Sequence, residues 1–274
     1  MKSYLTIVVA VLMTSAASAF AQDVCTSHPW AGRKVAYLGD SITDPNVKKS
    51  GVNYWAYLHE WLGITPYVYG VSGHQWHQIL GQEERLRKDH GEDFDAIMIF
   101  VGTNDYNAGV PIGEWFEEDS VVVNADGRMV ERIRRKPIFD RDTYRGRINC
   151  TLDSLKRMYP AKQIVLLTPI HRAYARFGDR NVQPDESHQN SCGEYVDAYV
   201  ESVKEASAIW SVPVIDIYSL SGLFPMHKEQ GIYFPGADDM LHPNAEGHRR
   251  LAMCLYYQLL ALPCSFSDLQ PIRL

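Results

Sequence analysis

The amino-acid sequence predicts an α/β fold of the doubly wound, flavodoxin-like type: a parallel five-stranded sheet with helices on both faces, plus an inserted β-hairpin. The alternation of two sequence patterns predicts this fold. Short apolar runs, typical of buried strands, alternate along the chain with segments whose apolar residues recur at helical spacing. Right-handed crossovers between consecutive parallel strands then place helices on both faces of the sheet. The predicted strands are Lys34–Leu38, Pro66–Tyr69, Ala96–Val101, Gln163–Thr168 and Val212–Ile217.

The helices between these strands are each marked by one apolar face. Residues three or four positions apart lie on the same side of a helix, and apolar residues at that spacing indicate the side that packs on the sheet. No linker rich in Pro, Ser or Gly divides the chain and no internal repeat is visible, so we expect residues 22–274 to form a single domain. The marking residues are Trp55, Leu58 and Leu62; Ile148, Leu152 and Leu155; Val196, Tyr199 and Val203; and Leu251, Leu255 and Leu259.

A β-hairpin is predicted over residues 120–135, within an insertion of about residues 106–140 that follows the third strand. Two β-prone arms flank Asp126-Gly127, a dipeptide typical of tight hairpin turns. Two interpretations are open: a surface hairpin without a role at the site, or a flap or dimer contact beside it. A basic cluster on its second arm is expected to be a solvated face rather than an anion site: Arg132, Arg134, Arg135 and Lys136.

Residues 1–21 have the features of a secretory signal peptide. Lys2 precedes an apolar stretch that is too short to span a bilayer comfortably, and small residues follow it. Cleavage is expected after Ala19 or Ala21, which predicts a secreted or periplasmic protein with no integral membrane segment after processing. The formal net charge of −6 argues against a nucleic-acid partner, which normally requires a basic face. The sequence carries no signal for an oligomeric state.

The first stretch that indicates chemistry is AYLGDSITD, residues 36–44. Ser41 follows the first predicted strand at its carboxyl end, where parallel sheets place their active sites. A turn would explain Gly39 and Asp40, and Ser41 could simply cap the next helix. A nucleophilic serine requires in addition a base, an acid that orients it, and donors for an oxyanion.

Residues 236–252, GADDMLHPNAEGHRRLA, could supply the acid and the base. Asp239 and His242 are three positions apart, a spacing that in a tight loop lets the carboxylate hold one imidazole nitrogen and leave the other free. Pro243 restrains His242 toward extended geometry, and Asn244 is a plausible cap for the next helix. A capping loop with a surface histidine is the alternative.

Two further loops could supply oxyanion donors. In IFVGTNDYN, residues 99–107, Asn104 follows a buried strand and offers a neutral amide that can bind developing negative charge without titrating. In YGVSGHQWH, residues 69–77, Gly73 has no side chain to keep its backbone N–H away from a substrate oxygen. Simple turn formation is the alternative at Asn104.

Together these four motifs, in this order, resemble those of the SGNH hydrolases, the GDSL lipase and esterase superfamily, and the strand–helix rhythm agrees over about residues 32–262. The second motif is the loosest match, since Val68 stands where many relatives carry an asparagine before the glycine. The resemblance implies that Ser41 is the nucleophile, His242 the general base and Asp239 its orienting acid. It also implies an oxyanion hole formed by the Ser41 and Gly73 amides and the Asn104 side chain, and no metal or organic cofactor.

The reaction implied is hydrolysis of a carboxylic ester through an acyl-enzyme on Ser41. The interpretation we favour for an exported chain is an acetylesterase acting on acylated carbohydrate; a lipid or lysophospholipid esterase, or a thioesterase, is the alternative within the superfamily. A non-catalytic glycan-binding protein is the alternative outside it. Four residues near the predicted crevice are candidates for substrate contact: Asp40, His74, Trp76 and Tyr106. His74 and His77 are expected to line a pocket or support structure rather than bind metal.

Five cysteines, an odd number, leave at least one thiol unpaired. Cys25 precedes the first strand, at the edge of the sheet opposite Ser41. The last helix starts beside His242 and runs antiparallel to the strands, which returns Cys264 to the edge where Cys25 lies. A Cys25–Cys264 disulfide is therefore expected in an oxidising compartment, with two free thiols on frayed termini as the alternative.

Overall fold

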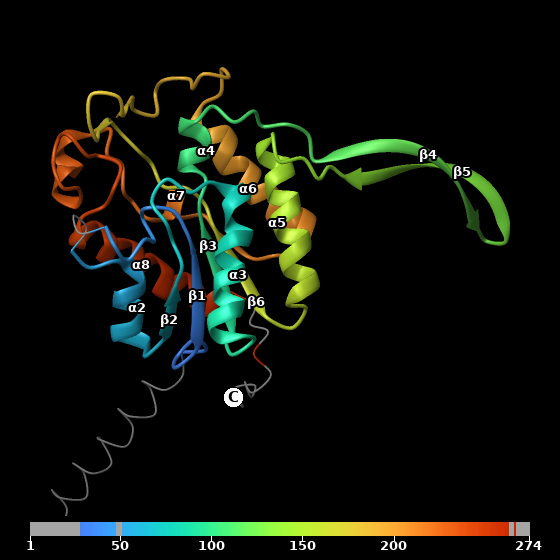
Figure 1. Ribbon diagram of the computed structural model, residues 1–274, viewed down its shortest axis with the longest axis horizontal. Helices are drawn as coiled ribbons and strands as arrows, with labels where there is room; N and C mark the ends of the chain where they lie inside the picture. Colours follow the sequence, from blue (N-terminus) through green and yellow to red (C-terminus); the bar gives the residue numbers. More distant parts are fainter. Residues whose placement is uncertain (1–27, 48–50, 263–265, 267–274) are drawn as a thin grey trace, which may run out of the picture.

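The fold is built on a parallel sheet of five strands in the order β2-β1-β3-β6-β9 (Figure 1). The computed structural model describes residues 28–47, 51–262 and 266. The expected signal peptide and the expected Cys25–Cys264 bridge lie outside the described residues and stay predictions. The strand order confirms the flavodoxin-like fold class. The strands are β1 (Lys34–Gly39), β2 (Thr65–Val68), β3 (Ala96–Phe100), β6 (Gln163–Leu167) and β9 (Val214–Ile215).

Each central strand contributes to two hydrophobic cores, because successive side chains of a strand point to opposite faces. In β1, Val35 and Tyr37 belong to one core, and Ala36 and Leu38 belong to the other. This burial on both faces explains why the strands appear in the sequence as continuous apolar runs.

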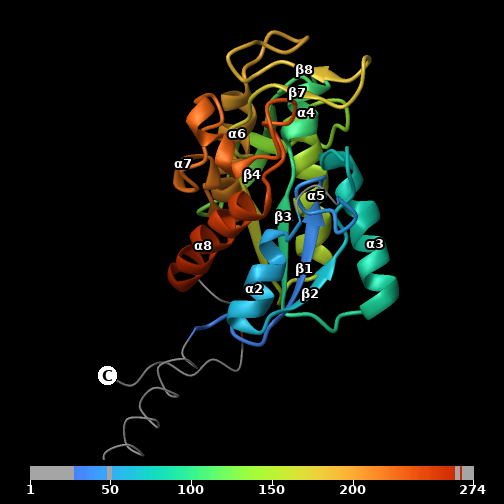
Figure 2. The same cartoon turned by 90° about the vertical axis from the view of Figure 1, so that its left-hand side faces the viewer.

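Helices cover both faces of the sheet, as Figures 1 and 2 show. The face that carries Val35 packs against α2 (Tyr54–Leu62) and α8 (Ala245–Ala261). The other face packs against α3 (Ile79–His90), α5 (Tyr144–Met158) and α6 (Val196–Trp210). The shorter elements are α4 (Thr103–Asn107), α7 (Ile217–Leu220), the 3-10 helices η2 (Trp76–Gln78) and η3 (Lys228–Tyr233), and the strands β7 (Ala175–Arg176) and β8 (Val182–Gln183).

The predicted hairpin is present and longer than expected, as β4 (Phe116–Ala125) and β5 (Arg128–Pro137). Asp126 and Gly127 both have positive φ, 53° and 76°, as a type I′ turn requires. The Asn149 amide on α5 donates to the carbonyls of Trp115 and Ile138, which directly precede β4 and follow β5 at the base of the hairpin.

This hairpin projects into solvent beside α5, while α8, which follows His242, lies on the opposite side of the molecule (Figure 1). None of its residues lines the cleft described below. The interpretation as a flap beside the site is therefore wrong, because the anchoring contacts to α5 direct the hairpin away from it. The interpretation as a dimer contact stays open.

Three cysteines of the described part are free: Cys150, Cys192 and Cys254. In the same part of the chain, none of the helices has the length and apolar character needed to cross a bilayer.

Candidate active site

Ser41 lies in a tight turn at the carboxyl end of β1. A Cβ on Gly39 would stand 2.4 Å from the carbonyl oxygen of Phe100, so only glycine lets β1 and β3 approach so closely at this point. The Asp40 carboxylate accepts from the Ile42 amide at 3.0 Å and thereby shapes the turn. The glycine, the acid and the serine thus have separate tasks: close packing, turn formation and presentation of a hydroxyl.

His242 lies within hydrogen-bond distance of both Ser41 and Asp239. Its Nε2 is 2.7 Å from the Ser41 Oγ, and its Nδ1 is 3.0 and 3.2 Å from the two Asp239 carboxylate oxygens. The three side chains come from opposite ends of the chain but meet at the carboxyl edge of the sheet. The arrangement matches a nucleophile, a base and an orienting acid.

Hydrogen bonds within the loop fix the positions of Asp239 and His242. Asp239 Oδ1 also accepts from the amides of His242 and Leu241, at 3.1 and 3.4 Å. Two residues after His242, the Asn244 side chain caps α8 by accepting from two amides of the first helical turn. The histidine is therefore held between a carboxylate and a capped helix.

The Asp239 carboxylate is ionised at neutral pH. Burial alone raises its pKa, but the hydrogen bonds and charge of His242, with the two backbone amides, lower the pKa below its ordinary value. An ionised Asp239 can hold a proton on Nδ1 of His242, which leaves Nε2 free to accept the proton of Ser41.

The expected oxyanion donors line the same cleft, a cavity of about 290 Å³. Within the described part of the chain, the backbone amides of Ser41 and Gly73 donate to no protein acceptor. One N–H of the Asn104 amide donates to the carbonyl of His74 at 3.1 Å, which orients the amide and leaves its second N–H available. The cleft thus brings together the six predicted groups on five residues: Ser41, Gly73, Asn104, Asp239 and His242.

One residue that holds the cleft together was missed by the sequence analysis. The Asp44 carboxylate accepts from both the amide and the hydroxyl of Ser72, at 2.9 and 2.8 Å. Burial raises the pKa of Asp44, but its hydrogen bonds outweigh burial and lower it. Asp44 thus ties the Gly73 loop to the Ser41 loop, and an acid three residues after the serine was the signal for it.

Three of the four residues expected to contact substrate are buried. Trp76 is 0 % exposed, and its indole N–H donates to the Tyr144 hydroxyl at 3.0 Å. Tyr106 is 4 % exposed and donates to the carbonyl of His188. Asp40 is 1 % exposed, and its burial raises its pKa to about 7. The prediction that Trp76 and Asp40 contact substrate is wrong, because the segments after the strands turn inward and these side chains complete the core. Tyr106 does not line the cleft but lines a neighbouring cavity, so its contact with substrate stays a prediction.

His74, the fourth candidate, is half-buried and does not line the cleft. Its Nδ1 accepts from the Gln82 amide at 2.9 Å, and burial lowers its pKa. In the described residues no group of three or more His, Cys, Asp or Glu side chains is arranged to hold a metal ion.

A short flap, residues 175–183, forms one wall of the cleft. It consists of β7, a turn and β8, and sequence patterns did not reveal it because its strands have only two residues each. The Arg176 amide donates to the carbonyl of Asp238 at 2.8 Å, which joins the flap to the Asp239 loop. Phe177 lines the cleft, with its ring edge-on to the His242 imidazole at a centroid distance of 5.2 Å.

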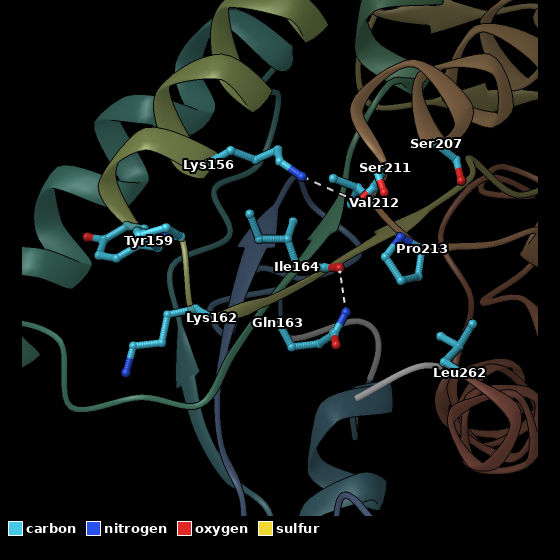
Figure 3. Close-up of a pocket in the computed structure, with 11 residues that line it drawn as sticks. Lys156, Tyr159, Lys162, Gln163, Ile164, Ser207, Ser211, Val212, Pro213 and Leu262 are labelled. Carbon is cyan, nitrogen blue, oxygen red and sulfur yellow. Dashed lines mark hydrogen bonds between the residues drawn. The ribbon is translucent and has the colours of Figure 1, made fainter. Parts of the chain in front are cut away.

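A second cavity, of about 490 Å³, lies at the other end of the sheet (Figure 3). Two serines line it, Ser207 and Ser211, but no histidine or carboxylate does. The Lys156 ammonium at its edge donates to the carbonyls of Trp210 and Ser211. Because this lysine is bound to backbone carbonyls, no base among the described residues contacts the hydroxyl of either serine of this cavity.

The chain is similar to known proteins in its sequence profile and in its fold. The profile of the GDSL-like Lipase/Acylhydrolase family matches residues 37–250. No curated protein matches the chain. Among solved structures, a protein from Lactobacillus plantarum is 24 % identical with a TM-score of 0.66, over 84 % of this chain and 98 % of that one.

Two further solved structures share the fold. A possible lipase from Chitinophaga pinensis is 20 % identical with a TM-score of 0.61, over 84 % of this chain and all of that one. A catalytic mutant of an acetylxylan esterase from Geobacillus stearothermophilus is 19 % identical with a TM-score of 0.50, over 86 % of this chain and 97 % of that one.

Proposed function

The chain belongs to the GDSL-like lipase/acylhydrolase family, and from this premise we propose that it is a serine esterase that removes acetyl groups from acylated carbohydrate. The observation that carries the proposal is the chain of contacts from Ser41 through His242 to Asp239, with 2.7 and 3.0 Å between the bonded atoms. The signal-peptide pattern of residues 1–21 supports export as part of the proposal.

In the proposed mechanism, the Ser41 oxygen attacks the ester carbonyl while His242 Nε2 takes the serine proton. The Ser41 and Gly73 amides and the Asn104 side chain then bind the negative oxygen of the tetrahedral intermediate. His242 gives the proton to the departing alcohol. Water then attacks the acetyl carbonyl while His242 takes a proton from it, and this proton goes to the Ser41 oxygen as the bond to serine breaks and acetate leaves. Each oxyanion donor contributes on the order of a hundredfold to the rate.

The lining of the cleft supports a short acyl group. Its apolar side chains among the described residues are Val47, Phe177 and Leu241. Each methylene of an acyl chain that is buried strengthens binding by about 0.8 kcal/mol. Three apolar side chains offer too little surface to bury the methylenes of a long acyl chain. The acetylxylan esterase that shares the fold supports the same choice.

Hydrolysis of p-nitrophenyl esters of increasing chain length tests the proposal. We expect kcat/KM for the acetyl ester to exceed that for the octanoyl ester at least about tenfold, since the long chain gains little burial. Ser41→Ala is the control for background hydrolysis. A preference for octanoate would favour a lipid esterase, and the absence of Ser41-dependent hydrolysis of all esters would refute the proposal.

A further inference from the structure

A polar cavity of about 300 Å³ continues the active-site cleft on the far side of the flap. The two cavities share Asn181 and Gln183. Among the described residues, no aspartate or glutamate lines this polar cavity, and Arg180 is its one charged lining residue. Amide and hydroxyl side chains dominate its wall: Asn107, Asn181, Gln183, Gln189, Asn190 and Ser191.

A chain of hydrogen bonds fixes the orientation of the two shared amides. The Arg172 guanidinium donates to Gln183 Oε1 at 2.7 Å, and Gln183 Nε2 donates to Asn181 Oδ1 at 3.0 Å. A guanidinium can only donate, so the oxygen of Gln183 must face Arg172 and its nitrogen must face Asn181. The oxygen of Asn181 is then occupied, and its Nδ2 group, which donates to no described residue, is the part left for a ligand.

Arg172 is an unusual choice for a purely structural residue. It is 0 % exposed, and the hydrogen-bond partners of its guanidinium among the described residues are the neutral side chains of Thr103 and Gln183 and the Thr103 carbonyl. Burying a cation without an ion-paired partner is costly; neutral hydrogen-bond acceptors, a tyrosine ring at 5.2 Å and the more distant charges of Glu186 and Asp40 offset only part of the cost, so burial still lowers the pKa of Arg172 to about 10. The guanidinium also donates to the Thr103 hydroxyl, and Thr103 is the neighbour of Asn104. Arg172 therefore links the segment that carries Asn104 to the flap.

We propose that this polar cavity beside the flap is the leaving-group subsite. It takes a neutral, hydroxyl-rich alcohol such as a sugar, and Asn181 Nδ2 donates to an oxygen of that alcohol. The proposal rests on the proposed function and names where the alcohol half of the ester binds. An amide-lined wall matches the mixed donors and acceptors of a sugar, whereas a fatty chain would leave these polar groups without partners. Arg172 and Gln183 are positioning residues for Asn181.

Two substrates with the same acyl group separate the alcohol subsite from the chemistry: phenyl acetate and a mono-O-acetylated methyl xyloside. In Asn181→Ala, we expect kcat/KM for the sugar ester to fall about tenfold, mainly through KM, the loss that one hydrogen bond of about 1.4 kcal/mol predicts. The aryl ester should stay within about twofold, because beyond the ester itself a phenyl ring has no oxygen to accept from Asn181 Nδ2. Asn124→Ala, on the exposed β4 strand, is the matched control.

A second variant tests the orienting chain without touching Asn181. In Gln183→Glu, both side-chain oxygens accept, so Asn181 must turn its nitrogen toward the new carboxylate and present its oxygen to the cavity. The new carboxylate pairs with Arg172, so folding is preserved or improved. We expect the same sugar-specific loss as in Asn181→Ala.

The outcomes separate the two proposals. A wild-type enzyme that hydrolyses neither ester refutes the proposed function and the subsite with it. Activity on the aryl ester without activity on the sugar ester refutes the subsite alone. Equal losses on both esters, or no loss on either, in Asn181→Ala would also refute the subsite.

Discussion

The described part of the chain has two antiparallel hairpins of very different size, and the smaller one lies at the candidate active site. The long hairpin, β4–β5, has ten residues in each strand and projects into solvent beside α5 (Figure 1). The flap has two residues in each strand and lines the cleft beside His242. A strong local turn signal thus shows that a hairpin exists but not what it faces, because its place is set by the residues that anchor its base.

The anchors of the two hairpins make the difference concrete. Asn149 of α5 binds the two residues at the base of the long hairpin, and the hairpin extends from there away from the candidate active site. The flap is instead bound to the backbone of Asp238, next to the acid that orients the histidine. Changes at the catalytic edge should therefore alter turnover, and changes in the long hairpin should not.

The largest effect is expected for Ser41→Ala. The variant should lose at least about a thousandfold in kcat for p-nitrophenyl acetate, because no other described hydroxyl contacts His242. Its midpoint of thermal unfolding should stay near the wild-type value, since one hydroxyl is removed at a loop edge. Turnover by purified Ser41→Ala at the wild-type rate would remove the basis of the comparison.

Asp239→Asn should have the next largest effect. An amide in place of the carboxylate favours the wrong histidine tautomer, and kcat should fall at least about a hundredfold. Asp238→Asn is the matched control, because Asp238 is exposed and contacts the flap through its backbone carbonyl. If kcat is unchanged in Asp239→Asn but falls severely in Asp238→Asn, Asp239 is not the acid that orients His242.

Phe177→Ala tests the flap itself. The ring packs edge-on against His242, a contact of about 0.5–1.5 kcal/mol, so kcat/KM for the acetyl ester should fall up to about tenfold. Ile133→Ala, an exposed apolar residue on the long hairpin, should leave kcat/KM unchanged. Equal effects of the two substitutions would mean that the flap has no special relation to the site.

The smallest kinetic effect is expected when the long hairpin is shortened. Replacing residues 118–135 by an Asn-Gly turn keeps the base, and kcat/KM should stay within about twofold of the wild-type value. Sedimentation of the same variant tests the dimer-contact interpretation, which would require wild type, but not the variant, to associate. A large change in KM would show that the hairpin reaches the substrate after all.

Much of the fold and the catalytic cluster could be predicted from the sequence, because both depend on local patterns. The buried strands produce apolar runs, and Ser41, Asn104 and Gly73 each directly follow a strand or its turn. Trp76 was misjudged because an aromatic residue after a strand can face either the crevice or the core, and only tertiary packing decides. Asn181 and Arg172 were missed because their importance lies in a hydrogen-bond chain between distant segments.

The central claim is that Ser41 forms a covalent intermediate with substrate, and active-site labelling tests it most directly. Purified enzyme would be treated with diethyl p-nitrophenyl phosphate, digested and mapped by mass spectrometry, with residual acetylesterase activity measured in parallel. We expect one diethyl phosphate group on Ser41, formed in proportion to the loss of activity, and no labelling of that peptide in the variant His242→Ala. Full inactivation with label on another residue and an unmodified Ser41 would contradict the account.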